Sequence, residues 1–542
     1  MDAVTQVPKA SNETVLNYGP GSAERIGLEG RLKELWDQSP QLPNWIDGEA
    51  VTGGGPEFAV TAPFEHAHVL GTFSAADTGD AAAAVAAAKR AAPGWQALSI
   101  DDRAAILLKA ADLLTGSWRH TLNAATMLGQ AKTSYQAEID AACELADFWR
   151  FNAQFAREIY AEQPPANSAG VWNRLDHRPL EGFVYAITPF NFTAIAGNLP
   201  TAPALMGSTV VWKPSPTQAL AADWTMRLLQ AAGLPPGVIN LVHGDGLAVS
   251  EVALADPDLA GIHFTGSTPT FQSLWRQVGE RIGSYRSYPR IVGETGGKDF
   301  VLAHPSADID VLRTALVRGA FEYSGQKCSA ASRAYVPASL WARLKDGLAD
   351  VTGGLPVGPV TDFSMFTSAV IDERAFTKHR AALQRAAGAD GVEILAGGGT
   401  DDTRGWFVDP TVITVTDPLD EAMTTEYFGP ILAVHVFDDA DYDRVVRGIA
   451  EDSKYALTGS IIAADRVAIA QAGERLRFAA GNFYVNDKPS GAVVGQQPFG
   501  GGRASGTNDK AGSAQNLMRW TSTRTIKETF EPPTSHGYPH MG

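Results

Sequence analysis

Cysteine is scarce in this chain of 542 residues, which contains only Cys143 and Cys328. Two cysteines cannot build the disulfide framework on which small secreted domains depend, so the composition favours a reducing compartment. The first residues of the sequence contain neither a basic segment nor an apolar one, and we see no signal peptide. The expected location is therefore the cytoplasm.

Positive charge and long apolar runs are also lacking. The 44 Lys and Arg residues are outnumbered by 60 Asp and Glu residues, which gives a net charge of −16. A chain of this sign does not attract nucleic acid or an anionic membrane. No apolar run reaches the length of about 18 residues that a membrane-spanning helix needs. The eleven histidines are dispersed, so we predict no metal site.

The remaining composition, 44% hydrophobic and 19% charged, is that of an ordinary globular protein. A chain of this length is too long for one core and should form two or three domains. Apolar strand-like runs at 182–187, 209–212, 238–242 and 261–264 alternate with helical patterns at 195–206 and 220–232. A second alternation covers residues 340–480. Both patterns predict βαβ units, and hence an α/β fold with parallel sheets.

Helical periodicity also predicts helices over residues 80–89, 101–114, 135–160 and 307–322. Asp77 and Thr78 are candidate N-caps for the first of them. Glu144 and Asp147 fall on the third among aromatic residues. Taken alone, such charges are interpreted as a solvated helix face.

Short polar or glycine-rich turns follow the predicted strands of the first alternation. They contain Asn191, Lys213, the run Gly244-Asp245-Gly246, and the pair Gly266-Ser267. The carboxyl ends of parallel strands share one edge of a sheet, where ligands bind. A lysine and backbone N–H groups at helix N-termini suit phosphate groups, so these turns together predict a nucleotide site. The common G-x-G-x-x-G fingerprint is absent after the first of these strands.

Cys328 lies in the stretch YSGQKCSA at residues 323–330, among small and polar residues rather than in an apolar run. A buried structural cysteine usually has apolar neighbours. Lys327 is adjacent in sequence, but adjacent side chains of an extended segment point to opposite faces, so its charge need not act on the thiol. This stretch alone leaves a nucleophile and an inert cysteine as equal alternatives.

These pieces resemble the aldehyde dehydrogenase family over residues 42–523. The shared motifs are the turn at Asn191, WKPS at 212–215, FTGS at 264–267, ExGGK at 294–298, GQxC at 325–328, ExFGP at 426–430 and PFGG at 498–501. Within the family, the chain is most similar to the L-glutamate γ-semialdehyde dehydrogenases. That similarity rests on GQKCS at 325–329, VGQQPFGG at 494–501 and SGTNDK at 505–510.

The resemblance implies a reaction and its catalytic residues. Cys328 would add to the aldehyde carbon, the Asn191 amide would stabilise the oxyanion, and Glu294 would activate the water that hydrolyses the thioester. The expected activity is NAD-dependent oxidation of L-glutamate γ-semialdehyde to L-glutamate, the second step of proline catabolism.

The resemblance also assigns the cofactor and substrate sites. NAD would contact a set of residues at the strand ends and beyond: Lys213, Ser215, Gly244, Gly266, Ser267, Glu426 and Phe428. The substrate carboxylate would bind Ser329 and the backbone N–H groups of Gly491 and Ala492, which suit an anion. Phe499 would pack the methylene chain, and Glu144 would face the ammonium group. The glutamate that the family often places three residues after the lysine is Pro216 here, so the choice between NAD and NADP stays open.

The implied organisation has three parts. A Rossmann-type NAD-binding domain would comprise residues 1–161 and 182–293, and an α/β catalytic domain residues 294–512. An arm of β-strands from residues 162–181 and 513–542 would make the protein a homo-oligomer, at least a dimer. Transient contact with proline dehydrogenase is a further expectation. The alternatives are another semialdehyde dehydrogenase, or a binding protein on this scaffold, although Cys328, Asn191 and Glu294 are all retained.

Overall fold

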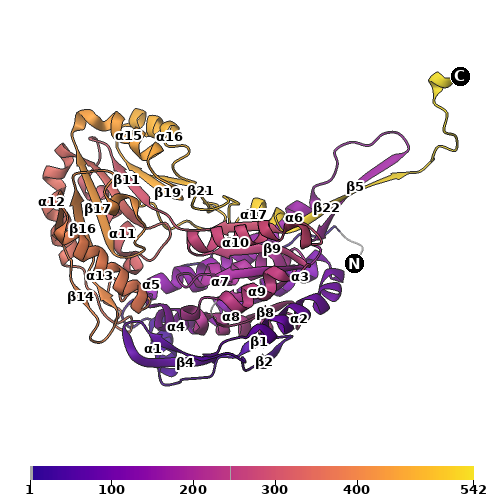
Figure 1. Ribbon diagram of the computed structural model, residues 1–542, viewed down its shortest axis with the longest axis horizontal. Coiled ribbons are helices and arrows are strands. Elements are labelled where there is room, and N and C mark those ends of the chain that lie inside the picture. Colours follow the sequence, from indigo (N-terminus) through magenta and orange to yellow (C-terminus); the bar gives the residue numbers. More distant parts are fainter. Residues whose placement is uncertain (1–3, 245) are drawn as a thin grey trace.

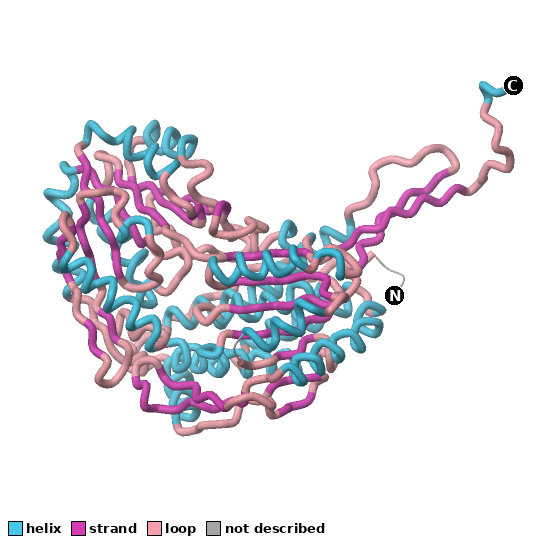
Figure 2. The backbone as a smooth tube through the Cα atoms, viewed as in Figure 1, coloured by secondary structure: helices cyan, strands magenta, loops and turns pink. Residues whose placement is uncertain are grey.

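The computed structural model describes residues 4–244 and 246–542 and contains two seven-stranded sheets, each in its own lobe (Figure 1). Helices cover both sheets (Figure 2). The predicted α/β class with parallel strands is confirmed. Asp245, in one of the predicted turns, lies outside the described residues.

The first sheet has the strand order β10-β9-β6-β7-β8-β1-β2. Its strands are β1 (Asn44–Ile46), β2 (Glu49–Val51), β6 (Phe183–Thr188), β7 (Thr209–Pro214), β8 (Ile239–Leu241), β9 (Leu259–Thr265) and β10 (Arg290–Glu294). The run from β10 to β8 is parallel, and β1 joins β8 antiparallel. All five parallel strands therefore end at one edge.

Helices pack on both faces of this sheet because alternate residues of a strand point to opposite sides. Phe183 and Tyr185 contribute to one hydrophobic cluster and Val184 and Ala186 to another. The first face is covered by α2 (Thr78–Ala97), α9 (Gly246–Ala255) and α10 (Thr268–Glu280). The second is covered by α3 (Ile100–Thr115), α6 (Leu145–Ala161), α7 (Thr193–Leu205) and α8 (Ala219–Ala232).

The second sheet has the order β13-β16-β17-β12-β11-β19-β20 and is parallel except for β13. Its strands are β11 (Asp299–Ala303), β12 (Ala331–Pro337), β13 (Val392–Ala396), β16 (Thr411–Val415), β17 (Ile431–Phe437), β19 (Thr458–Ile462) and β20 (Asn482–Val485). The helices of this lobe are α11 (Ile309–Phe321), α12 (Ala338–Gly353), α13 (Glu373–Gly388), α14 (Glu421–Thr424), α15 (Tyr442–Glu451) and α16 (Arg466–Arg475). The sequence predicts this alternation, but β11 was not expected.

The amino-terminal third holds elements that the sequence pattern did not reveal. They are α1 (Ala23–Trp36), α4 (Arg119–Gln130), β3 (Glu57–Ala62) and β4 (Glu65–Ser74). The helix predicted over 135–160 is three consecutive parts: α5 (Ser134–Ala137), a π-helical segment (Glu138–Glu144) and α6. The π segment matters for the site described below because Asp140 and Glu144 lie on it.

An arm projects from the first lobe (Figures 1 and 2). It consists of β5 (Val171–Pro179) and β22 (Thr521–Thr529), which pair antiparallel along their full length. The short helix α17 (Ala514–Met518) leads into β22. The strand expected in the tail therefore forms, and it pairs with the other arm segment of the same chain.

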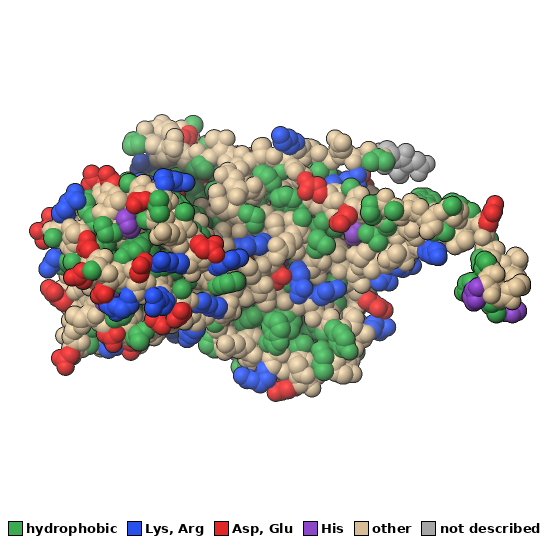
Figure 3. All heavy atoms as spheres, turned by 90° about the horizontal axis from the view of Figure 1, so that it is seen from above, with side chains coloured by type: hydrophobic (Ala, Val, Ile, Leu, Met, Phe, Trp, Pro, Cys, Tyr) green, Lys and Arg blue, Asp and Glu red, His purple; other side chains and the backbone are tan. Residues whose placement is uncertain are grey.

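Acidic and basic side chains are intermixed on the face shown in Figure 3, most densely over the second lobe. No helix among the described residues is long and apolar enough to cross a membrane.

Gly182 is critical for the start of the β6–β9 pair. Its φ is +136°, and a Cβ there would lie 1.9 Å from the carbonyl oxygen of Asp258. That carbonyl accepts a hydrogen bond from the Phe183 N–H at 3.0 Å. We predict that Gly182→Ala costs about 2–4 kcal/mol through strain and overlap. The check is a fall in the midpoint of thermal unfolding.

Gly233→Ala is the matched control, because Gly233 also has positive φ (+101°) but open space around its Cβ position. Its expected cost is about 1 kcal/mol. Equal losses of thermal stability in the two variants would contradict the packing argument.

Candidate active site

The parallel strands of the first sheet bring most of the predicted nucleotide-binding residues to one edge. Asn191 follows β6, Lys213 is the penultimate residue of β7, and Gly244 follows β8. Gly266 and Ser267 follow β9, and Glu294 is the last residue of β10. The Gly266 N–H donates to the Glu294 carbonyl at 3.2 Å, which joins the last two turns.

Lys213 is buried, and its ammonium lies over the start of α9. A Cβ built on Gly246, the first residue of α9, would be 4.0 Å from Nζ. Ser267 caps α10 by accepting the Thr270 N–H at 3.3 Å. Ser215 lies beside the end of β6, where its N–H donates to the Thr188 carbonyl at 3.0 Å. The lysine at the start of α9 offers positive charge, and the N-termini of α9 and α10 offer N–H donors, to a phosphate group.

The cysteine loop has an unusual backbone. Tyr323, Ser324 and Gly325 all have positive φ, at 52°, 49° and 64°. A Cβ on Gly325 would lie 2.3 Å from the carbonyl oxygen of Gly429. Ser324 is held by its N–H, which donates to the Thr367 hydroxyl at 2.7 Å. The loop therefore needs glycine at residue 325 for its conformation and for its close contact with the ExFGP segment.

Asn191 connects this loop to the first sheet. Its Nδ2 donates to the Gln326 carbonyl at 3.0 Å, two residues before Cys328. The Gln326 side chain accepts the Ile371 N–H at 2.8 Å. Asn191 and Gln326 are both buried. The asparagine turn of one lobe thus lies directly against the cysteine loop of the other.

A buried ion pair that the sequence analysis missed supports the same junction. Lys132 Nζ donates to Asp140 Oδ2 at 2.7 Å. The Asp140 carboxylate also accepts the N–H groups of Thr193 and Ala194, at 2.9 and 2.8 Å, at the start of α7. The ammonium lies 3.9 Å from the ring centre of Phe192 and 4.7 Å from that of Tyr323.

This cation therefore contacts the Asn191 turn and the cysteine loop together. No spacing rule pairs a lysine after α4 with an acid on the following π segment, so the sequence carries no local signal for it.

Cys328 is partly exposed and has a free thiol. Burial raises the pKa of this thiol well above its usual range, and the carboxyl groups of Glu294, Asp299 and Glu426 add to the effect. Lys327 does not counter it, because its Nζ forms an ion pair with Glu322 at 2.9 Å. The resting site therefore holds a neutral thiol.

Glu294 is surrounded by the glycine-rich segments near the end of the chain. Burial raises the pKa of its carboxyl to about 8; Asp509 adds to the rise and Lys510 opposes it. A Cβ on Gly500 would lie 3.4 Å from Glu294 Oε1. The SGTNDK motif at 505–510 and the PFGG motif thus form the environment of this carboxyl. Its pKa suits proton transfer near neutral pH.

Glu426 packs against Gly296 and Gly297, and Phe428 lies near Phe190. Glu426 Oε1 accepts the Gly297 N–H at 2.8 Å, and a Cβ on Gly296 would lie 2.0 Å from its other oxygen. A Cβ on Gly297 would lie 2.5 Å from the Cys328 carbonyl. Phe428, at φ +57°, has its ring centre 5.8 Å from that of Phe190, which precedes Asn191. The two glycines are therefore needed for close approach.

The predicted substrate anchors also meet. Ser329 donates its hydroxyl hydrogen to Ser490 Oγ at 3.0 Å, and Ser490 directly precedes Gly491 and Ala492. Gly491 is exposed with φ +96°. Phe499 is partly exposed and exchanges backbone hydrogen bonds with Ala511. The carboxylate anchor expected at 491–492 is thus adjacent to the residue that follows Cys328.

The solvated-face interpretation of Glu144 and Asp147 is wrong for Asp147. Asp147 is 3% exposed, because it binds the Asn12 amide and the Glu13 N–H of the amino-terminal segment. Burial raises its pKa to about 6. Glu144 is partly exposed, and burial of its carboxyl together with nearby Asp140 raises its pKa to about 8.

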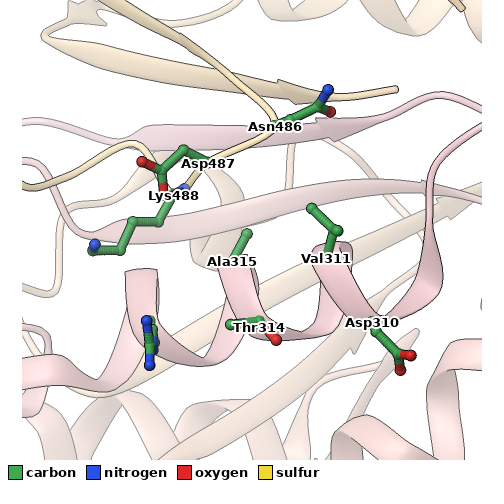
Figure 4. A pocket seen from close by; sticks show the side chains of 8 residues that line it. Asp310, Val311, Thr314, Ala315, Asn486, Asp487 and Lys488 are labelled. Atoms are coloured by element: carbon green, nitrogen blue, oxygen red, sulfur yellow. Dashed lines mark hydrogen bonds between the residues drawn. The ribbon is translucent and has the colours of Figure 1, made fainter. Parts of the chain in front are cut away.

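One surface pocket lies outside this cluster of predicted residues. This pocket, between α11 and residues 486–488, is lined by Asp310, Thr314, Asp487 and Lys488 among others (Figure 4). None of the predicted site residues lines it. Within residues 4–244 and 246–542, no group of three or more His, Cys, Asp or Glu side chains could hold a metal ion.

Comparison with known proteins identifies the family. Residues 50–526 match the Aldehyde dehydrogenase family. The chain belongs to the aldehyde dehydrogenase family.

Several relatives of this aldehyde dehydrogenase carry the same name. The probable delta-1-pyrroline-5-carboxylate dehydrogenase of Schizosaccharomyces pombe is 49% identical over 98% of each chain. The mitochondrial enzyme of Homo sapiens is 45% identical over 98% of this chain and 94% of that one. A crystal structure of the Mycobacterium tuberculosis enzyme bound with NAD is 61% identical, with a TM-score of 0.97 and full coverage of both chains.

The cysteine loop generates a prediction for this dehydrogenase. Gly325→Ala should displace the loop from Gly429 and move the thiol, and a shift of about 1 Å can lower a rate about 100-fold. Steady-state NADH formation measures kcat. Gly502→Ala is the control, because nothing lies within 4 Å of its Cβ position. A Gly325→Ala enzyme with kcat within twofold of the control would refute the role of this close contact.

Proposed function

We propose that this aldehyde dehydrogenase oxidises L-glutamate γ-semialdehyde, formed by hydrolysis of Δ1-pyrroline-5-carboxylate, to L-glutamate with NAD. This is the second step of proline catabolism. The observation that carries the proposal is the junction of Cys328 and Ser329 with the loop at Ser490, Gly491 and Ala492. A carboxylate anchor at this loop would lie beside the proposed nucleophile, which supports the proposal. Relatives of this name that are 45–61% identical over nearly the whole chain support it.

The first step is addition of Cys328 to the aldehyde carbon. The thiol passes its proton to water, the S–C bond forms, and the carbonyl oxygen becomes an anion. We assign its stabilisation to the Asn191 amide and the Cys328 backbone N–H. The hydrogen bond from Asn191 to the Gln326 carbonyl fixes the amide at the cysteine loop in advance. Loss of one such donor typically costs about 2.7–4 kcal/mol of barrier.

The second step removes hydride from the thiohemiacetal carbon and leaves a thioester on Cys328. When bound, NAD supplies the hydride acceptor. Glu294 then takes a proton from water, whose oxygen attacks the thioester and releases the carboxylic acid and the free thiol. This step requires ionised Glu294, and the raised pKa makes its carboxylate an effective base.

The residues at the sheet edge fit NAD. Lys213 beside the start of α9 and the N-terminus of α10 at Ser267 offer a cation and N–H donors for the adenosine and pyrophosphate groups. Ser215, Gly244 and Gly266 belong to the same row of turns. Glu426 and Phe428 would hold the nicotinamide end near Cys328. Pro216 supplies no carboxylate for the ribose, so selection for NAD depends on other residues.

The enzyme would select its substrate by binding the carboxylate and ammonium groups, which are far from the aldehyde carbon. The carboxylate would bind the Ser329 hydroxyl and the N–H groups of Gly491 and Ala492. Glu144 would attract the ammonium group, and Phe499 would pack against the methylene chain. Burial and Asp140 raise the pKa of Glu144 to about 8 although Lys132 and Lys327 oppose the rise, and the positive charge of a bound ammonium group would favour the ionised carboxylate.

We further propose the domain division expected from the sequence and a homo-oligomer formed through the arm. The projection of β5 and β22 from the body supports an arm that contacts another subunit (Figure 1). The chain spans 54% of a proline utilization A (PutA) protein of Bdellovibrio bacteriovorus at 28% identity. Transient contact with a separate proline dehydrogenase is consistent with that longer relative.

The cytoplasm remains our proposed location, whereas several eukaryotic relatives are named mitochondrial.

Substrate specificity tests the proposal directly. NADH formation should be at least about tenfold more efficient, as kcat/KM, with pyrroline-5-carboxylate than with succinic semialdehyde, which has no ammonium group. Cys328→Ala should be inactive because no thioester can form. A preference for succinic semialdehyde would overturn the assignment of Ser329, Gly491, Ala492 and Glu144, while the dehydrogenase activity would stand.

The pKa of Glu294 predicts a pH dependence. Below about pH 8 the carboxyl is protonated and cannot accept a proton, so thioester hydrolysis should slow about tenfold per pH unit as the pH falls. Rapid-quench measurement of the acyl-enzyme reports this step. Glu294→Gln should accumulate acyl-enzyme after one turnover at every pH. A Glu294→Gln enzyme that hydrolyses its thioester with the original pH profile would exclude Glu294 as the base.

A further inference from the structure

The amino-terminal segment, residues 4–18, runs over the helix that contains Glu144. We call it the N-terminal strap. Its Leu16 N–H and Tyr18 hydroxyl donate to Glu138 at 2.9 and 2.7 Å. Its Ala10 N–H donates to the Gln154 side chain at 3.1 Å. The strap is therefore bound to the π segment at its carboxyl end and to α6 at Ala10, on either side of Asn12.

Asn12 lies at the middle of the strap and connects two other parts of the protein. Its Nδ2 donates to Asp147 Oδ2 at 2.8 Å and to the Val494 carbonyl at 2.7 Å. Its Oδ1 accepts a hydrogen bond from Gln496 Nε2 at 2.9 Å. One side chain thus uses two donor hydrogens and an acceptor to join α6 to the segment at 494–496.

That segment belongs to the loop with the proposed carboxylate anchor. We call residues 490–497 the anchor loop. It rests on α6 through Gly495, where a Cβ would lie 2.3 Å from Cε1 of Phe151. Within the loop, the Gln497 side chain accepts the Val493 N–H at 2.9 Å. The loop is therefore stiff, and a change where it joins Asn12 should be transmitted to Gly491 and Ala492.

Asp147 is one helical turn beyond Glu144. Asn12 links Asp147 to Val494 and Gln496. It therefore connects the helix that would recognise the ammonium group to the loop that would recognise the carboxylate. Two recognition elements bind one zwitterion well only when their separation is fixed, because the ordering cost is then already met.

We propose that Asn12 is a positioning residue for amino-acid semialdehydes, which sets the anchor loop at the correct distance from Glu144. This inference rests on the proposed function and extends it to a strap far from Cys328 in the sequence. An asparagine is required, because a carboxylate at this position would lack both donor hydrogens and would face Asp147 and a carbonyl oxygen.

The test compares two aldehydes in the full-length enzyme. With pyrroline-5-carboxylate, Asn12→Ala should raise KM about five- to tenfold and change kcat less than twofold, the pattern of lost ground-state binding. With propanal, which has no carboxylate or ammonium group, kcat/KM should stay the same. The KM for NAD should also be unchanged. Gln496→Ala removes the contact from the loop side and should raise the same KM by a smaller factor.

Gln154→Ala is the matched control, because it releases the strap at Ala10 but leaves the Asn12 contacts intact. It should retain the original KM for both aldehydes. If Asn12→Ala proves unstable, the exposed Gln496 provides the same test without disturbing Asp147.

Three results would overturn the inference: an unchanged KM in both Asn12→Ala and Gln496→Ala, a parallel loss with propanal, or an equal effect of Gln154→Ala. The wild-type enzyme separately tests the proposed function. If it does not prefer pyrroline-5-carboxylate to succinic semialdehyde, that function fails irrespective of Asn12.

Discussion

The buried Lys132–Asp140 pair is the interaction on which the active-site geometry depends. It joins the start of α7 to the π segment, and its ammonium contacts Phe192 beside Asn191 and Tyr323 in the cysteine loop. Removing one partner of such a pair leaves an uncompensated buried charge, which is strongly destabilising. The proposed oxyanion donor, Asn191, and the proposed nucleophile, Cys328, come from different lobes. The Lys132 ammonium contacts the segments that carry both residues, and Asn191 Nδ2 donates a hydrogen bond to the Gln326 carbonyl, two residues before Cys328.

Glycine determines how closely the motifs approach each other. Gly296 and Gly297 contact Glu426 and the Cys328 carbonyl, and Gly325 contacts Gly429, at distances that no side chain could occupy. The motifs GQxC, ExGGK and ExFGP are therefore mutually dependent parts of one packed centre. The pKa values of Cys328 and Glu294 both rise, because burial in this centre disfavours their charged forms and neighbouring carboxyl groups add to the effect.

The elements proposed to recognise the substrate are also held together by buried contacts. Asp147 is buried because the N-terminal strap covers it, and the strap in turn contacts the loop that follows Gly491. Asp147, which the helical pattern alone assigns to a solvated face, is thus part of a hydrogen-bond network between segments that are remote in sequence. Buried polar networks of this kind specify geometry as well as stability, since each member needs all of its partners.

The sequence by itself determined the α/β class, the row of turns at one sheet edge and the family, because these depend on local periodicity and on short motifs with fixed residue types. It did not determine α1, α4 or β11, whose patterns are weak, nor the π segment inside the helix at 135–160. Only the tertiary structure decided that Asp147 is buried, that Lys132 pairs with Asp140, and that Asn12 meets Val494. The Asn12 contacts join residues far apart in the chain, whereas Lys132 and Asp140 are only eight residues apart but are paired only when both are buried. The free energy of all these contacts comes from burial and pairing that exist only in the packed structure.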